Sequence, residues 1–216
     1  MKTLQDLGLK DEVLPGGGET LDDLPTFGTF EPPPPPGTYV FQLPPTLPFE
    51  AFDVFDYPTG GGQRIRVEFS QDYPLTIVEA RDAHLVGTRF DCRISNAERP
   101  RGRDKIIVSD AQYLLRALGE TVKPAANKAY ILAIQKHAGQ QFRADISWSW
   151  NCRKDANIRM VGTDGQPVEV DQLGCGKRYY DRQVPRNADG TLPERIGCEC
   201  GATLRAFANL DNIRAR

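Results

Sequence analysis

The sequence predicts a small, mainly β fold with a short helical part and a long polar segment inserted before its last strand. Three observations lead to this prediction. Most apolar runs alternate with polar residues, as half-buried strands do. Two neighbouring segments have helical periodicity instead, and about fifty residues rich in glycine, charge and cysteine separate the last two predicted strands. With 216 residues, the chain is long enough to bury a substantial core.

Residues 1–36 have the composition of a disordered tail. They contain three consecutive glycines and five consecutive prolines, and the proline run favours a stiff polyproline II spacer. Seven acidic and two basic residues give this tail a net charge of −5, and since the whole chain carries −2, the remainder carries +3. An acidic tail on a basic body is typical of proteins that handle a polyanion; the alternative is a solubilising tail.

Three strands are predicted between residues 37 and 94, with a further extended segment from Leu75 to Val78. In each strand the apolar side chains occupy every second position, so that one face can pack in a core. We therefore expect Cys92 to be a packed core thiol, because it alternates with apolar neighbours. The predicted inward residues, strand by strand, are Tyr39, Phe41 and Leu43; Ile65, Val67 and Phe69; and Phe90, Cys92 and Ile94.

Two helices are predicted next. Ser109 and Gln112 form a capping box, and the apolar stripe that follows it ends at Gly119. The second helix begins near Asn127 and ends at Gly139.

Two more strands complete the predicted order. One runs over residues 142–150, with Trp148 and Trp150 on its core side, and the last begins near Ala202. Three strands, a helical segment, a strand, an insertion and a final strand are the order of a five-stranded Greek-key barrel, the OB-fold. We therefore expect an OB-fold-like barrel formed by residues 37–150 together with 202–216, interrupted by an insertion over residues 151–201.

Four of the five cysteines lie in or beside this insertion. Cys152, Cys175 and Cys198 are separated by 22 residues at each step, and Cys200 follows two positions later. Thiolates bind zinc tetrahedrally, and a zinc ion can fold a loop too polar to form its own core. Glycines after Cys175 and Cys200 permit the tight turns that such a site needs. The sequence thus predicts a zinc-ribbon-like insertion, with buried free thiols or a partly degenerated site as alternatives.

Nothing in the sequence indicates an enzyme. The two histidines stand outside any catalytic or metal-binding motif, and the phosphate-loop, G-x-S-x-G and H-E-x-x-H patterns do not occur. Asp53, Asp56 and Glu68 give a weaker alternative, a nuclease-like metal site. The N-terminus does not have the pattern of a signal peptide and no apolar run has membrane-spanning length, so we expect a protein of the reducing cytoplasm without membrane contact.

Several positions have the character of a surface that binds single-stranded nucleic acid. Such a strand is held by cations along its backbone and by aromatic rings beneath its bases. Phe207 is the most informative position, because an aromatic ring among polar neighbours can support a stacked base. Taken singly, each residue also fits an ordinary solvated surface, and Tyr179 fits packing against the metal site. The predicted contacts are Arg64, Arg66, Arg89, Arg93, Arg101, Arg103, Lys177, Arg178, Tyr179, Arg205 and Phe207.

The order and spacing of five segments resemble phage-type single-stranded DNA-binding proteins. These segments are PGTYVFQL, RIRVEFSQDYPLTI, SDAQYLLRALG, GQQFRADISW and AFANLDNIRA, and the resemblance covers residues 37–150 and 202–216. The resemblance implies an OB-fold and single-stranded DNA binding in phage replication or recombination, in the host cytoplasm. Members of that family usually carry an acidic C-terminus that recruits partners, whereas this chain ends on basic residues and carries its acids at the front. The cysteine insertion is not a general feature of the family either.

The sequence therefore leads to two hypotheses of different kinds. The first is a non-catalytic single-stranded DNA-binding protein with a structural zinc ion, whose acidic tail contacts replication or recombination proteins. The alternative is a structural or adaptor protein, such as a phage virion or assembly component, in which zinc stabilises a protein-docking loop.

Overall fold

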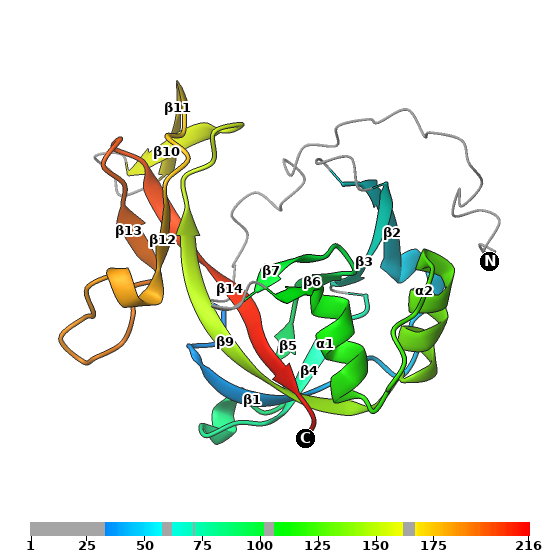
Figure 1. The fold of residues 1–216 in the computed structure, drawn as a ribbon. Coiled ribbons are helices and arrows are strands. Elements are labelled where there is room, and N and C mark those ends of the chain that lie inside the picture. Colours follow the sequence, from blue (N-terminus) through cyan, green and yellow to red (C-terminus); the bar gives the residue numbers. More distant parts are fainter. Residues whose placement is uncertain (1–32, 58–61, 71, 102–105, 162–166) are drawn as a thin grey trace. The chain divides into compact units, whose positions relative to one another are not determined.

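The computed structural model describes residues 33–57, 62–70, 72–101, 106–161 and 167–216, and it is mainly β (Figure 1). The predicted acidic tail, apart from its last four residues, lies outside this description. The described strands form antiparallel sheets, and none of these sheets closes into a barrel. The longest sheet is an open path in the order β13-β14-β9-β1-β4-β5, and β12 also pairs with β9. The expected closed barrel is thus not found among the described residues.

Contacts divide the chain into two compact units. Unit 1 contains Thr38–Ala144 and Asn212–Arg216, and unit 2 contains Asp145–Asp211 with the short segment ending at Gly37. These boundaries lie several residues away from those expected at residues 150/151 and 201/202, because the long strands β9 (Gln141–Asn151) and β14 (Thr203–Arg214) contribute residues to both units.

The last residues of the predicted tail belong to the folded part of unit 2. Pro34 is buried, and its carbonyl oxygen accepts a hydrogen bond of 2.9 Å from the indole nitrogen of Trp148. A buried indole N–H requires an acceptor, and this backbone oxygen supplies one. Ordered structure therefore begins before Gly37, where the sequence placed its start.

Unit 1 contains two groups of paired strands, a small hairpin and two helices. The burial of alternate residues in the predicted strands is confirmed: Ile65, Val67 and Phe69 of β3 are all inaccessible or nearly so. The elements of this unit and its adjoining turns are β1 (Gly37–Gln42), η2 (Phe49–Ala51), β2 (Phe52–Asp56), β3 (Gln63–Phe69), β4 (Leu75–Glu79), η3 (Ala83–Leu85), β5 (Arg89–Phe90), β6 (Cys92–Ser95), β7 (Arg99–Arg101), β8 (Ile106–Val108), α1 (Asp110–Ala117) and α2 (Asn127–Lys136).

The predicted strand over residues 89–94 is in fact two short strands in different sheets. Phe90 pairs with Leu75 of β4, whereas Cys92 pairs with Phe69 of β3. The chain changes sheets between them, and both Phe90 and Ile94 are buried as a result. Cys92 itself is only half-buried, so the prediction that it packs in the core is confirmed only in part.

Both predicted helices are confirmed. The Ser109 hydroxyl accepts a hydrogen bond from the Gln112 backbone, and the Gln112 side chain accepts one from the Ser109 backbone, which completes the capping box of α1. Helix α2 buries Tyr130, Ile131 and Ile134. In the part of the chain that the structure describes, no helix has the length and apolar character needed to cross a membrane.

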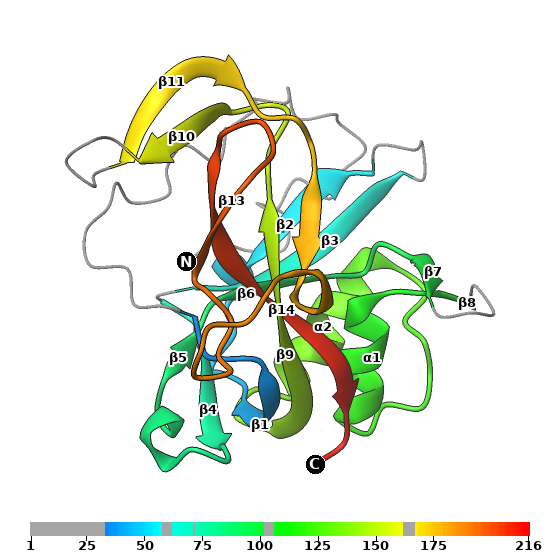
Figure 2. The same ribbon diagram turned by 90° about the vertical axis from the view of Figure 1, so that its left-hand side faces the viewer.

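Unit 2 is built on the ends of β9 and β14 that lie within it (Figure 2). The side chains of Ile146, Trp148 and Trp150 on β9 are buried, as expected, and the two tryptophan rings meet edge to face at 6.1 Å. The remaining elements are β10 (Asn157–Val161), β11 (Pro167–Leu173), β12 (Arg178–Tyr180), η4 (Asp181–Gln183) and β13 (Arg195–Gly197).

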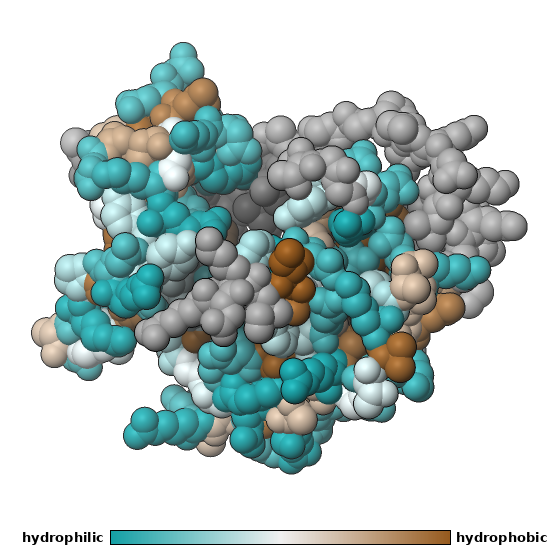
Figure 3. All heavy atoms as spheres, in the orientation of Figure 1, coloured by the Kyte–Doolittle hydropathy of each residue, from teal (hydrophilic) through white to brown (hydrophobic). Residues whose placement is uncertain are grey.

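The surface seen in Figure 3 is largely hydrophilic, and its hydrophobic residues form separate small patches. Scattered apolar side chains of this kind are normal on a folded protein. Any binding function of this face therefore depends on polar and charged side chains, together with individual exposed rings.

Candidate functional site

The four cysteines of the insertion come together in unit 2. Cys152 follows β9, Cys175 lies between β11 and β12, and Cys198 and Cys200 lie in the turn that joins β13 to β14. Their sulfur atoms all lie within 4.8 Å of one another, and this is the group among the described residues that could hold a metal ion. The expected clustering is confirmed.

The sulfur separations fit metal coordination better than disulfide bonding. Cys152 and Cys200 have their Sγ atoms 3.5 Å apart, as do Cys175 and Cys198, and all four thiols are free. A disulfide bond is only about 2.05 Å long. Four sulfurs at about 2.3 Å from a tetrahedral ion lie about 3.8 Å from one another, close to what is observed.

Strand pairing places the first two cysteines. Strands β9 and β12 are antiparallel, and the Cys152 backbone N–H continues this ladder with a 2.8 Å hydrogen bond to the Lys177 carbonyl. The Cys175 backbone N–H donates to the Cys152 sulfur at 3.2 Å. Such N–H···S bonds favour the thiolate form and fix the orientation of a ligating sulfur.

Two glycines permit this close approach. A Cβ atom on Gly174 would lie 2.0 Å from the Arg153 carbonyl oxygen and 2.9 Å from the Cys152 sulfur. A Cβ atom on Gly176 would lie 2.3 Å from the Lys154 side chain, and Gly176 also has a φ of +78°. The glycine predicted to allow a turn after Cys175 is thus confirmed, and Gly174 is a second one that the sequence analysis did not single out.

The other two cysteines are placed by the tight β13–β14 turn. The Cys198 backbone N–H donates to the Ala202 carbonyl at 2.7 Å, and Gly201 closes the turn with a φ of +89°. The Ala202 backbone N–H is the main reason why the pKa of Cys200 is lowered to about 6, whereas burial raises the pKa of Cys152 to about 12. The lowered pKa favours the thiolate form of Cys200, which is the form that binds a metal.

Beside the cysteines, one side of a four-stranded sheet gathers arginines and aromatic rings. The strands are β13, β14, β9 and β12, and residues directly opposite on paired strands share a side. Arg195 lies opposite Arg205, and Tyr180 lies opposite Ser149. Ser149 accepts a 3.0 Å hydrogen bond from the Asn209 side chain, which joins the two halves of the surface. We name this surface the β14 face; it contains Arg178, Tyr180, Arg195, Arg205, Phe207 and Asn209.

Three of the predicted nucleic-acid contacts belong to the β14 face: Arg178, Arg205 and Phe207. Phe207 is 46% exposed, so its expected outward orientation is confirmed. Arg195 was missed because β13 is too short to show periodicity. Tyr180, 44% exposed, takes the place predicted for Tyr179.

Tyr179 and Lys177 lie on the other side of β12. Tyr179 pairs with the buried Trp150, and its hydroxyl lies 3.6 Å from the Cys198 sulfur. Lys177 forms an ion pair with Glu199, the residue between the two C-terminal cysteines. Alternation along β12 explains both positions, because only Arg178 and Tyr180 can point to the β14 face.

The arginines predicted in unit 1 are dispersed over several elements. Arg64, Arg66 and Arg93 share one side of the β2-β3-β6 sheet, but Arg66 is paired with Asp53 at 2.9 Å and Arg93 with Glu68. Arg89 lies on β5, in a different sheet. Of the predicted loop residues, Arg101 is described by its backbone in β7, and Arg103 lies outside the described residues.

The same ion pairs bear on the nuclease-like alternative. Asp53 and Glu68 neutralise arginines, and among the described residues they form no metal-binding group with Asp56.

The fold and site thus define a mainly β protein with a four-cysteine cluster beside a basic, aromatic sheet face. No protein-family model matches the sequence, and no curated protein or solved structure is similar to it. The case for a function therefore depends on the geometry of the chain itself.

Proposed function

We propose that this protein binds single-stranded nucleic acid without catalysis, with the β14 face as its binding platform and a structural zinc ion held by the four cysteines. The resemblance noted above favours single-stranded DNA, in phage replication or recombination. The OB-fold, which the order of the predicted elements indicates and the resemblance implies, is also part of the proposal.

The observation that carries the proposal is that Arg195 and Arg205 lie directly opposite each other on paired strands, on a face that also carries exposed aromatic rings. Like charges directly opposite one another destabilise a sheet. Burial lowers the pKa of Arg205; the charge of Arg195 lowers it further, and the charge of Glu194 raises it. A polyanion bound across the two arginines relieves the repulsion and releases its own counterions.

Phe207 and Tyr180 supply the stacking part of the proposal. Both rings are exposed by nearly half, and both lie among polar and cationic side chains of the β14 face. A ring in such surroundings can stack on any base, since every base has a π-face. We therefore propose binding without base specificity.

Zinc is the metal that fits the donor set best. Four cysteine sulfurs favour zinc over the hard cations, which prefer oxygen. Each cysteine lies within three residues of an end of a strand that forms the β14 face. A metal bound there would hold the ends of those strands together and so keep the platform rigid.

A titration with fluorescent oligo-dT at two salt concentrations tests the binding proposal. We expect tight binding that weakens steeply with salt, because each neutralised phosphate releases counterions. Phe207→Ala should weaken binding roughly 5- to 150-fold, since stacking contributes about 1–3 kcal/mol per base. Ile107→Ala, which truncates an exposed apolar residue of β8 in unit 1, is the matched control and should leave binding unchanged. An affinity near zero for the wild type at low salt would reject the proposal.

Elemental analysis of the purified protein tests the metal. We expect about one zinc per chain, and Cys200→Ser should reduce that content because thiolates are the ligands. Cys92→Ser, at the one cysteine outside the cluster, should keep it. A wild-type zinc content near zero would contradict the proposed centre.

A structural or adaptor protein is the second candidate, and the β10–β11 hairpin favours it. Met160 and Val168 lie opposite each other there, and both are exposed, as is Leu173. Exposed apolar residues on a hairpin beside the cysteines suit a protein-docking loop. Failure to bind oligo-dT, together with a normal zinc content, would favour this candidate. In both cases we propose that the acidic tail contacts protein partners.

A further inference from the structure

The two exposed rings of the β14 face lie on different strands, with β9 between them. Tyr180 is on β12, directly opposite Ser149 of β9, and Phe207 is on β14, the other neighbour of β9. Both rings are exposed by nearly half. A nucleic acid that uses both rings must therefore cross β9, and the distance between the rings decides which of its bases they can hold.

Side-chain hydrogen bonds give the register of β14 against β9. Asn209 donates to Ser149 at 3.0 Å, and Ser147 donates to Asp211. Diagonal contacts across a sheet are typical of long side chains, so these short ones indicate residues that lie directly opposite each other. The residue number rises along one strand as it falls along the other. Strand β14 is therefore antiparallel to β9, as β12 is.

Sheet geometry then gives the spacing of the two rings. Phe207 lies two residues away from Asn209 along β14, whereas Tyr180 lies in line with Ser149. The two ring-bearing residues are thus separated by two strand spacings of about 4.8 Å and, along the strands, by about 6.7 Å. Their Cα atoms are therefore about 12 Å apart. Neighbouring bases of a stacked strand are about 3.4 Å apart, and even a fully extended nucleotide covers only about half of the distance between the rings.

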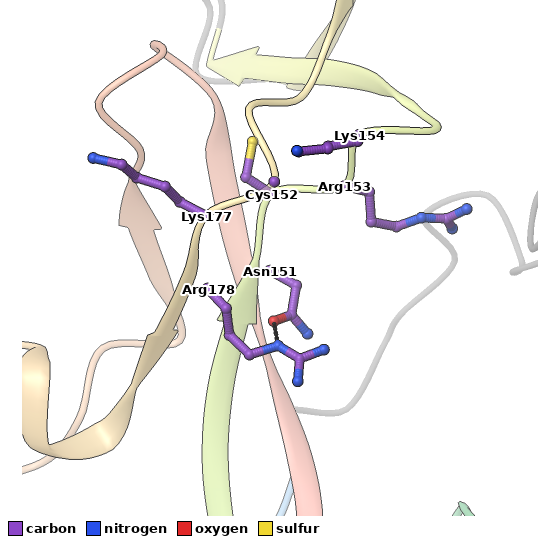
Figure 4. Close-up of a pocket in the computed structure, with 7 residues that line it drawn as sticks. Asn151, Cys152, Arg153, Lys154, Lys177 and Arg178 are labelled. Carbon is purple, nitrogen blue, oxygen red and sulfur yellow. Dashed lines mark hydrogen bonds between the residues drawn. The ribbon is translucent and has the colours of Figure 1, made fainter. Parts of the chain in front are cut away.

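Positive charge lies between the two rings. Arg178 lies directly opposite Asn151 of β9, and its Nε donates to the Asn151 side-chain oxygen, as the dashed line in Figure 4 shows. This hydrogen bond directs the guanidinium toward the middle strand. Arg178 precedes Tyr180 by two positions, and Arg205 precedes Phe207 by two. Because β12 and β14 run in the same direction, both rings have their arginine on the same side, which suits a polymer with one polarity.

We propose that the β14 face holds three consecutive nucleotides of one strand, with the two outer bases stacked on Phe207 and Tyr180; this inference rests on the proposed function. The middle nucleotide crosses β9, where Arg178 meets the sugar–phosphate backbone. Its base lies over Ser149 and Asn151, which offer no ring to stack on. Because every base has a π-face, the spacing of the stacked bases matters and their identity does not.

Oligonucleotides in which most bases are replaced by abasic sites test this spacing. Strands of equal length carry the same number of phosphates, so the electrostatic part of binding stays constant. One strand carries a single thymine, and the others carry two thymines that are adjacent or have one or three abasic sites between them. We expect one intervening abasic site to give the tightest binding, roughly 5- to 150-fold tighter than the single thymine, the range for stacking one more base. Adjacent thymines should bind nearly as the single thymine does.

Variants of the two rings show whether they cause this preference. Phe207→Ala and Tyr180→Ala should each reduce the affinity for the spaced thymines to that for the single thymine. Tyr180→Phe is the matched control, because it keeps a ring and should keep the preference. Since both side chains are exposed, thermal unfolding of these variants should match that of the wild type.

The possible outcomes separate this inference from the proposed function. Adjacent thymines that bind as tightly as the spaced ones, tightest binding at the longest separation, or a preference that survives Phe207→Ala would overturn the three-nucleotide span. The proposed function would stand in each of these cases, because the strands bind. If no strand binds at low salt, oligo-dT included, the proposed function is wrong and the three-nucleotide span is rejected with it.

Discussion

At the scale of single residues, the glycines around Cys175 show how closely the backbone approaches the sulfurs. Gly174 lies against the Arg153 carbonyl and the Cys152 sulfur, where a side chain has no room. The flexible end of a neighbouring side chain could move aside, but a backbone carbonyl can do so only if the chain itself moves. Gly174 is therefore part of the site although it supplies no ligand.

Substitution of Gly174 tests this view. Gly174→Ala should destabilise unit 2 by about 1–3 kcal/mol, the usual range for overpacking, and should lower the zinc content. Gly197→Ala is the control, because a Cβ atom there meets no atom within 4 Å and Gly197 is next to Cys198. Zinc content and thermal unfolding of the two variants give the comparison, and equal behaviour would show that the approach to Arg153 is not required.

At the scale of elements, the end of α2 is tied to the segment that follows α1. Glu120 accepts hydrogen bonds from Lys136 at 2.8 Å and from the ring of His137 at the same distance. His137 is buried at the C-cap of α2. The hydrogen bonds from Lys136 and then from His137 lower the pKa of Glu120.

This link makes stability depend on pH. A carboxylate whose pKa is lowered in the folded state stabilises it above the unfolded pKa, about 4.3 for Glu, and the effect is lost as pH falls through the folded pKa. Glu120→Gln should therefore lower the free energy of unfolding at pH 7 and make it fall less steeply below about pH 4.3. Urea unfolding between pH 3 and 7 measures both, with Asp56→Asn, which changes an exposed carboxylate of β2, as control. A profile for Glu120→Gln parallel to that of the wild type would contradict this assignment.

At the scale of the whole molecule, the two units have different sources of stability. Unit 1 buries large apolar side chains such as Phe41, Phe69 and Phe142, and the rings of Phe41 and Phe142 stack at 5.7 Å. Unit 2 has the short strands β12 and β13 and the cysteine turns, which pack few apolar residues of their own. Short, polar segments of this kind commonly depend on a bound metal.

Removal of the metal should therefore act on one unit. After chelation, amide hydrogen exchange should speed up in β12, β13 and the cysteine turns and stay slow in β3, α1 and α2, because the latter are stabilised by apolar packing. Adding zinc back should restore protection. Uniform loss of protection in both units, or no change in either, would contradict a zinc centre that stabilises unit 2 alone.

The sequence by itself determined the local structure and the chemical identity of the cluster. Alternation placed Ile65, Val67 and Phe69 in the core, Ser109 capped α1, and the spacing and glycines selected the four cysteines. These features depend on neighbours a few positions apart, or on a residue type with few alternative roles. Periodicity also put Phe207 outward before any partner strand was known.

The tertiary structure alone decided which surfaces these elements share. Alternation cannot tell to which sheet a strand belongs. It predicts one strand over residues 89–94 with Arg89 and Arg93 on one face, whereas the two arginines lie in different sheets. Arg195 joined Arg205 only through the pairing of β13, which is too short for a pattern. Lys154 contacts Gly176, which is 22 positions further along the chain. Such contacts arise from long-range pairing, whose register is set by the packing of the whole fold rather than by local sequence.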